Sequence, residues 1–212
     1  MKGAKRMCCP SCLSDPTVPV VADTSVIINL NATGFAQTIL DALPNPCIVV
    51  EEVAAELEDG RRSGRKTTDC LNVLIAAGQV EVAQLGNEGV QHFSGLVSGL
   101  AANTLDDGEA ATVAYALEHS VSALIDERKA IKICAERFGA LSTGYTVDLL
   151  AHRKVETALG RTGLAEGVFN ALYYGRMRVP AEYVNWVVNL IGHDRIKECV
   201  SLPRSIRIPQ RV

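Results

Sequence analysis

The 212-residue sequence predicts an α/β protein in which two layers of helices cover a central parallel sheet, followed by a helical C-terminal extension. Three observations predict this architecture. Short apolar runs alternate with amphipathic stretches from residue 20 to residue 144. The runs are apolar at nearly every position, which is typical of strands buried on both faces of a parallel sheet. Beyond residue 145 the sequence becomes helical in character.

The predicted elements follow one another as strand and helix in turn. The first strand is expected to end at Asp23, where a helix begins at Thr24 or Ser25. Further strands are expected at residues 46–50, 80–85, 121–126 and 140–144. Further helices are expected at residues 51–60, 67–79, 87–103, 106–120 and 127–139. This order is the pattern of a three-layer α/β domain.

The C-terminal part is predicted to be helical and then extended. Residues 179–192 form the clearest helix, with Pro180 near its start and Gly192 at its end. An apolar stripe runs along this helix through Tyr183, Val187, Leu190 and Ile191. The final stretch, "SLPRSIRIPQRV", is basic and interrupted by prolines, so we expect it to be extended rather than packed.

The length and composition of the chain bound its organisation. With 48% hydrophobic residues, 212 residues suffice for one domain with additions but not for two large domains. We expect an N-terminal extension at 1–16, the α/β domain at 17–158 and a helical extension with a basic tail at 159–212. No apolar run approaches the roughly 20 residues that span a bilayer, and no apolar stretch follows the charged start as in a signal peptide. We therefore expect a cytoplasmic protein without a membrane partner.

The cysteines do not predict a disulfide framework. There are seven, an odd number, and several lie in apolar segments where a reduced thiol acts as a small hydrophobe. Cys8, Cys9 and Cys12 contain half of a zinc knuckle, but no second pair follows at the spacing that a structural zinc site needs. We interpret this cluster as part of an incidental N-terminal extension rather than a metal site.

Four acids are expected near one edge of the sheet. Asp23 and Asp126 end strands, Glu109 opens a helix, and Glu56 lies in the helix after residues 46–50. The ends of parallel strands and the first turns of the following helices share one edge, so these carboxylates are predicted to converge. Carboxylates held close together raise one another's pKa and favour a divalent cation, and an oxygen-only site suits Mg²⁺ or Mn²⁺. Such ions support hydrolysis of phosphodiester bonds.

Each of these acids also has a purely structural interpretation. Asp23 would cap the helix that follows it, and Glu56 would be solvated together with Glu52; Asp106 and Glu109 would form a capping box, and Asp126 with Glu127 would cap the helix at 127–139. Any one acid is explained in this way. Four at one edge of a sheet by coincidence is the less economical interpretation.

Four segments resemble the PIN-domain family, in particular its VapC-like prokaryotic branch. They are "VVADTSVIINL", "VVEEVAAELEDG", "LDDGEAATVAYAL" and "ALIDERKAIKICAERFGALSTGYTVDLL", in the order of the family, over residues 18–152. The resemblance implies a PIN-like α/β/α fold and an Mg²⁺- or Mn²⁺-dependent ribonuclease. It implies Asp23, Glu56, Glu109 and Asp126 as the catalytic acids, with Asp23, Glu109 and Asp126 as metal ligands.

Two details of this resemblance are less regular. Ser142 and Thr143 lie near the place where the family often has a hydroxyl group. The N-terminal cysteine extension and the residues after "DLLAHR" have no counterpart in a minimal PIN toxin.

Local basic segments are the expected contacts to RNA, because the net charge of −3 gives no overall attraction to nucleic acid. Arg61, Arg62, Arg65 and Lys66 follow the helix that carries Glu56, where they would hold a phosphate backbone or form a solubilising surface loop. Arg128 follows Asp126 and would steer a phosphate or balance the acids.

The leading hypothesis is a metal-dependent endoribonuclease that acts on RNA as the toxin of a toxin–antitoxin pair, with an antitoxin protein as partner and a homodimer as its assembly. The alternative is a non-catalytic PIN-like RNA-binding or scaffolding module. A phosphatase of Rossmann type ranks lower, because it needs a second Asp two residues after the first and Ser25 stands there.

Overall fold

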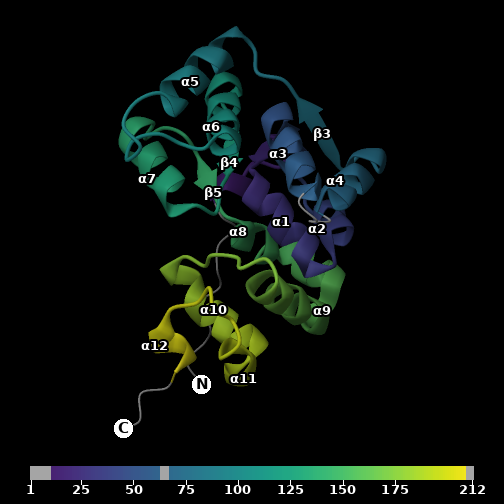
Figure 1. The fold of residues 1–212 in the computed structure, drawn as a ribbon. Helices are drawn as coiled ribbons and strands as arrows, with labels where there is room; N and C mark the ends of the chain where they lie inside the picture. Colours follow the sequence, from purple (N-terminus) through teal and green to yellow (C-terminus); the bar gives the residue numbers. More distant parts are fainter. Residues whose placement is uncertain (1–10, 63–66, 209–212) are drawn as a thin grey trace.

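The computed structural model describes residues 11–62 and 67–208 and contains one parallel sheet. Its strands are β1 (Val20–Ala22), β2 (Cys47–Val50), β3 (Val80–Ala83), β4 (Ser122–Leu124) and β5 (Thr143–Gly144). Their spatial order is β3-β2-β1-β4-β5, and every neighbouring pair is parallel. Figure 1 shows helices on both sides of this sheet, so the predicted three-layer α/β/α fold is confirmed.

The helices of the sheet region are α1 (Thr24–Thr33), α2 (Ala36–Ala42), α3 (Glu51–Arg62), α4 (Thr67–Ala76), α5 (Asn87–Val97), α6 (Asp107–His119), α7 (Arg128–Arg137) and α8 (Thr146–Leu150), with a short 3-10 turn, η1 (Ser11–Leu13), before β1. Helix α6 packs against β1, β2 and β4, and α5 packs on α6. The C-terminal helices are α9 (Arg153–Tyr173), α10 (Ala181–Ile191), α11 (His193–Ile196) and α12 (Arg204–Arg207).

The core explains why the strands are apolar throughout. Val20, Val21 and Ala22 of β1 are at most 2% exposed, because helices cover both faces of this central strand. The chain runs from β1 to β2 and β3 on one side and then returns to β4 and β5 on the other. In such sheets the chain reverses its direction of progress at a topological switch point, and ligands bind at the carboxyl ends of the strands there. Here the switch point lies between β1 and β4.

Strands β3, β4 and β5 are shorter than the expected 80–85, 121–126 and 140–144, and three further sequence expectations needed correction. Helix α5 ends at Val97 rather than residue 103, because Ser98 is extended and Gly99 has a φ of 127°. Helix α4 ends at Ala76, shortly before Gly78 with its φ of 70°. The C-terminal stretch is not wholly extended, because Leu202 is buried and α12 follows it. The predicted helix at 179–192 is confirmed as α10, in which Tyr183, Val187 and Ile191 are buried.

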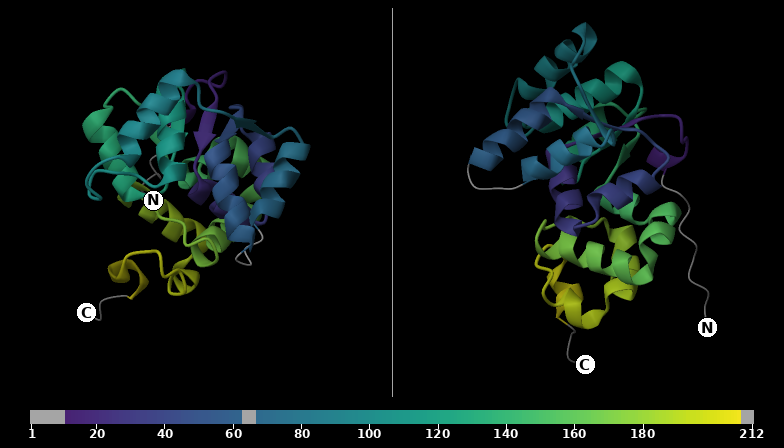
Figure 2. Two further views of the ribbon diagram at one scale, coloured as in Figure 1. Left: turned by 45° about the horizontal axis from the view of Figure 1, so that its top comes forward. Right: turned by 90° about the vertical axis from the view of Figure 1, so that its right-hand side faces the viewer.

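The C-terminal helices pack on the sheet domain through α9. This helix contacts α1 and α2. It is kinked at Gly160, which has a non-helical φ of 65° and lies two residues beyond the predicted domain boundary at residue 158. Figure 2 shows α9 directly beside these helices, with α10 to α12 beyond it. The division into 1–16, 17–158 and 159–212 stays a prediction, and Cys8 and Cys9 lie outside the described residues.

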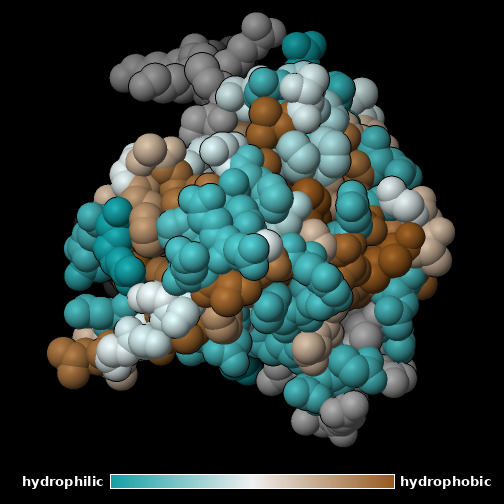
Figure 3. All heavy atoms as spheres, turned by 90° about the horizontal axis from the view of Figure 1, so that it is seen from above, coloured by the Kyte–Doolittle hydropathy of each residue, from teal (hydrophilic) through white to brown (hydrophobic). Residues whose placement is uncertain are grey.

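The surface gives two further facts. Seen from above, the coloured residues are mainly hydrophilic, with hydrophobic side chains in separate patches (Figure 3), as is usual for a protein surface. None of the helices within 11–62 and 67–208 has the length and apolar character needed to cross a membrane.

Candidate functional site

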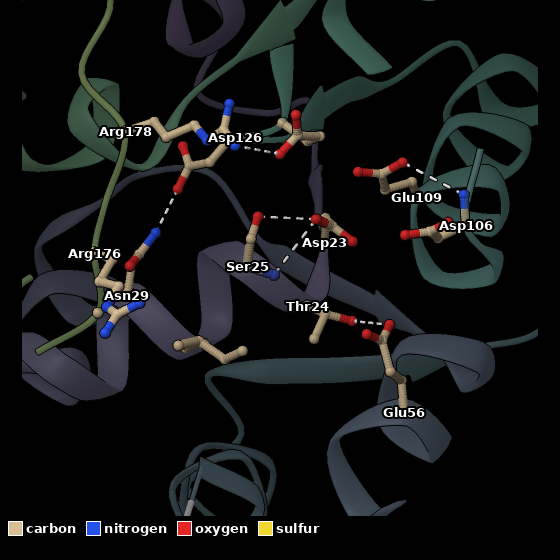
Figure 4. A pocket seen from close by; sticks show the side chains of 13 residues that line it. Asp23, Thr24, Ser25, Asn29, Glu56, Asp106, Glu109, Asp126, Arg176 and Arg178 are labelled. Carbon is tan, nitrogen blue, oxygen red and sulfur yellow. Dashed lines mark hydrogen bonds and ion pairs between the residues drawn. The ribbon is translucent and has the colours of Figure 1, made fainter. Parts of the chain in front are cut away.

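A pocket of about 230 Å³ lies at the carboxyl ends of β1 and β4 (Figure 4). It is lined by Asp23, Thr24, Ser25, Ile28, Asn29, Glu56, Asp106, Glu109, Asp126, Glu127, Gly175, Arg176 and Arg178. The four acids singled out from the sequence therefore all border one pocket. Its position is the switch point where an α/β sheet of this topology binds its ligand.

Asp23 occupies the end of β1 and the cap of α1 at once. Its side chain is 3% exposed and accepts hydrogen bonds from Ser25 Oγ at 2.9 Å and from Ser25 N at 3.4 Å. Both bonds go to Oδ2, and Figure 4 shows the other oxygen directed away from Ser25, on the side of Glu109 and Asp106. Burial raises the pKa of Asp23 to about 6, against the opposing effect of the Ser25 hydrogen bond. Asp23 therefore does cap α1, and its second carboxylate oxygen remains directed into the pocket.

Glu109 faces Asp23 from the first turn of α6. One of its oxygens closes a capping box by accepting from Asp106 N at 3.4 Å. Burial, and then the charge of Asp23, raise the pKa of Glu109 to about 7. Two half-buried or buried carboxylates thus repel each other across a small space, and a proton or a cation between them relieves the repulsion.

Glu56 reaches the pocket from α3, as expected, and Glu52 does not line it. Thr24 Oγ1 donates to Glu56 Oε2 at 2.7 Å. Gly108 of α6 makes this approach possible, because a Cβ at that position would stand 2.5 Å from Glu56 Oε2 and 3.0 Å from Thr24 Oγ1. The glycine of "GEA" therefore leaves space for the Glu56 carboxylate.

Asp126 is held far more tightly than a free ligand would be. It is 4% exposed, and it accepts from Asn29 Nδ2 at 2.6 Å, Thr146 N at 2.8 Å and Thr146 Oγ1 at 2.6 Å. Burial raises its pKa, whereas these donors lower it. The proposed capping of the helix at 127–139 is wrong for this residue, because the cap of α7 is Glu127, whose side chain makes no cap hydrogen bond.

A second buried acid, Asp148, lies close enough to Asp126 for its charge to raise the pKa of Asp126. It accepts from Tyr145 N at 2.7 Å and from the hydroxyl of Tyr183 on α10. Burial is the main cause that raises its pKa. Tyr183 thereby connects the C-terminal helices to the helix that carries Thr146.

Sequence reasoning did not identify Asn29, Thr146, Asp148 or Tyr183. In the segment "LSTGYT" the hydroxyl that contacts an acid of the pocket belongs to Thr146, whereas Ser142 and Thr143 do not line the pocket. The available signal was a threonine and an aspartate in "GYTVDLL", at the first turn of a helix directly after a strand.

The carboxylates fit a metal ion in a limited way. Within residues 11–62 and 67–208, no group of three or more His, Cys, Asp and Glu side chains is arranged to hold one. Asp23, Glu109 and Asp126 border the same pocket, and Asn29 and Thr146 donate hydrogen bonds to both oxygens of Asp126. Asp23 and Glu109 still offer the one or two carboxylates with which Mg²⁺ is usually bound, together with water and substrate phosphate. The assignment of all three acids as ligands stays a prediction.

The basic residues near the pocket differ from those expected. Arg65 and Lys66 lie outside the described residues, and Arg61 and Arg62 belong to the end of α3 rather than to the loop after it. Arg128 does not line the pocket. Two arginines of the C-terminal part do, Arg176 and Arg178, and their sequence signal is "GRMRVP" between two helices.

A family model described as a PIN domain matches residues 19–193, most of the chain. The chain belongs to the PIN-domain family. The match includes α9 and α10, so these helices belong to the matched region although the resemblance noted from the sequence ended at residue 152. No curated protein and no solved structure matched the chain. PIN domains are generally nucleases that use divalent metal ions, which agrees with an acidic pocket at the switch point.

Proposed function

We propose that this PIN-domain protein is a metal-dependent endoribonuclease that hydrolyses phosphodiester bonds of RNA. The observation that carries the proposal is the pair of Asp23 and Glu109, two carboxylates in one pocket whose pKa values are raised to about 6 and about 7. Charges that are this costly when unpaired are typical of functional sites. The resemblance to prokaryotic PIN ribonucleases supports RNA as the substrate.

The residues of the pocket would divide the work. Asp23 and Glu109 would hold Mg²⁺ or Mn²⁺, which supplies a more acidic water and neutralises charge on the phosphoryl group when bound. Glu56, fixed by Thr24, offers an acceptor for a proton of the attacking water. Asn29 and Thr146 keep the carboxylate of Asp126 in place at the other end of the pocket.

The test is cleavage of a single-stranded RNA oligonucleotide labelled at its 5′ end, with Mg²⁺, with Mn²⁺ or with EDTA. We expect cleavage only with metal, and a loss of about 100-fold or more in Asp23→Asn. Asp194→Asn is the matched control, because Asp194 lies on α11 with a side chain 98% exposed. A DNA oligonucleotide of the same sequence checks the preference for RNA. Cleavage that persists in EDTA or in Asp23→Asn contradicts the proposal.

A second candidate is a non-catalytic PIN-like module that binds RNA. The observation that favours it is Asp126, whose two oxygens already accept from Asn29 and Thr146. RNA binding without cleavage in either metal would support this candidate and refute the first.

The toxin role, the antitoxin partner, the homodimer and the cytoplasmic location stay predictions. Expression of the chain in a bacterial host tests the toxin role directly. We expect growth arrest with the wild-type chain and none with Asp23→Asn.

A further inference from the structure

The segment between α9 and α10 brings positive charge to the acidic pocket. Arg176 and Arg178 are exposed and line the pocket, whereas Met177 between them is fully buried and Val179 is 7% exposed. Figure 4 shows both arginines on one stretch of chain, on the side of the pocket where Asn29 and Asp126 lie. The buried side chains anchor the segment while the arginines stay at the surface.

Contacts with α1 and α9 fix the path of this segment. Met177 N donates to Ala171 O at 2.9 Å. Gly175 lies directly against the side-chain oxygen of Asn29, and a Cβ there would also stand 2.8 Å from Ala171 O. Arg176 has a φ of 56°, a left-handed conformation that is uncommon for residues other than glycine. Such conformations persist where the surrounding structure enforces them, and they are frequent at functional sites.

The arginines only partly balance the acids. Six carboxylates line the pocket beside these two guanidinium groups, namely Asp23, Glu56, Asp106, Glu109, Asp126 and Glu127. Arg178 pairs with Glu127 at 3.1 Å, but the two side chains are 48% and 37% exposed, so the pair is weak and easily exchanged for another anion. Arg176 makes no ion pair with any residue of the described part of the chain.

Aromatic rings precede the arginines on the same segment. Tyr173 and Tyr174 are 43% and 70% exposed, and their rings meet edge to face at 4.9 Å. The ring of Phe169, earlier in α9, stacks on the ring of Tyr173 with 5.5 Å between their centroids. Exposed tyrosines beside arginines are the residue types with which proteins hold single-stranded nucleic acid, by base stacking and by phosphate contacts.

We propose that residues 173–178, the tyrosine–arginine arm, position single-stranded RNA at the acidic pocket: Arg176 and Arg178 contact phosphates beside the bond to be cleaved, and Tyr174 stacks on an unpaired base. The inference rests on the nuclease proposed above, and it assigns the substrate contacts to the C-terminal part rather than to the basic residues after Glu56. Arg178 exchanges Glu127 for a phosphate when RNA binds.

The test measures binding separately from cleavage. In an Asp23→Asn background, fluorescence anisotropy gives the Kd of a labelled single-stranded RNA at several salt concentrations. We expect Arg176→Gln/Arg178→Gln to weaken binding about tenfold at low salt and to reduce the slope of log K against log salt by about 1.4, from two lost phosphate contacts. Lys132→Gln/Lys197→Gln is the matched control, since it removes equal charge from side chains 73% and 55% exposed that do not line the pocket.

The stacking contact has its own readout. Tyr174→Ala should weaken the binding of single-stranded RNA by about 5-fold or more, whereas Tyr174→Phe should retain the wild-type Kd. Neither change should affect the binding of duplex RNA. Thermal unfolding checks that each variant is folded. Equal Kd values and salt slopes for the arginine variant and the lysine control overturn the role of the arginines. An equal loss of duplex and single-stranded binding in Tyr174→Ala overturns stacking.

The outcomes also separate this inference from the proposed function. If the wild-type protein binds RNA through the arm but does not cleave it, the inference about the arm is supported and the nuclease function is refuted. If the wild-type protein cleaves RNA and the arm variants bind RNA normally, the nuclease function is supported and the inference about the arm is refuted.

Discussion

Asp23 and Asp126 end neighbouring strands and are both almost completely buried, yet the chain holds them in different ways. Asp23 accepts from Ser25, two residues away, at 2.9 and 3.4 Å, and both bonds go to one oxygen. Asp126 accepts three shorter bonds on both oxygens, from residues 97 and 20 positions away. A local cap thus leaves a carboxylate partly available, whereas donors from distant elements commit it to the structure.

The largest expected effect is a difference in stability between variants of Asp126 and variants of Asp23. Asp126→Ala leaves Asn29 Nδ2 and two donors of Thr146 buried without an acceptor, so we expect the free energy of unfolding to fall by about 2 to 4 kcal/mol. Asp23→Ala loses a cap worth about 1 kcal/mol but also removes a buried charge, so its net change should be under about 1 kcal/mol. Urea denaturation at pH 7.5 in EDTA measures both, and equal losses would contradict the comparison.

The pH dependence of stability probes the Asp23 end. Its pKa is raised to about 6 in the folded state, and that of Glu109 to about 7, so the folded state binds more protons than the unfolded chain between about pH 4 and pH 7. Stability from these groups is therefore present at low pH and is lost as the pH rises through this window. For Asp23 the loss is at most about 3 kcal/mol.

A matched variant isolates this effect from the other carboxylates. In metal-free protein, the difference in unfolding free energy between Asp23→Asn and wild type should grow from pH 4.5 to pH 7.5. Mn²⁺ should raise the melting temperature of wild type more at pH 7.5 than at pH 5, and should not raise that of Asp23→Asn. If the difference in unfolding free energy does not change with pH, the folded state does not raise the pKa of Asp23.

Tyr183→Phe tests the support behind Asp126. The change removes the hydroxyl donor of Asp148 and keeps the buried ring, so we expect a loss of about 1 to 2 kcal/mol. Tyr173→Phe removes a hydroxyl from a half-exposed ring and should be close to neutral. Chemical denaturation measures both, and a neutral Tyr183→Phe would mean that the C-terminal helices do not stabilise this end of the pocket.

The smallest effect on stability is expected from Gly108→Ala. The new methyl group displaces the Glu56 carboxylate, so the usual gain of about 0.5 to 1 kcal/mol from replacing a helical glycine should be absent, while cleavage falls. Gly95→Ala is the matched control, because Gly95 lies within α5 and a Cβ there meets nothing within 4 Å. Gly95→Ala should show the gain and retain full activity. Equal behaviour of the two variants would remove Glu56 from the mechanism.

The sequence predicted those parts of the site that depend on local order. Asp23, Glu109 and Asp126 were found because strand ends and helix starts are visible in the apolar pattern, and such places converge in a parallel sheet. Thr146 and Asn29 were not found, because their contact with Asp126 depends on how α8 and α1 meet in space. The prediction for Arg128 also rested on its place next to Asp126 in the sequence, but Arg128 does not line the pocket.

The tyrosine–arginine arm was out of reach for a different reason. It borders the pocket only because α9 packs on α1 and α2 and returns the chain toward the sheet. No pattern in the linear order of residues reports this return. Packing between elements far apart in the chain decided it.

The hydrogen bond from Tyr183 to Asp148 means that the C-terminal helices help to hold a buried acid of α8. A chain trimmed to the size of a minimal toxin would lose the hydroxyl that donates to Asp148 and would leave this buried acid with Tyr145 N as its remaining named donor. Relatives that lack the helix of Tyr183 should therefore carry a residue other than aspartate at the position of Asp148. The two changes are expected to occur together.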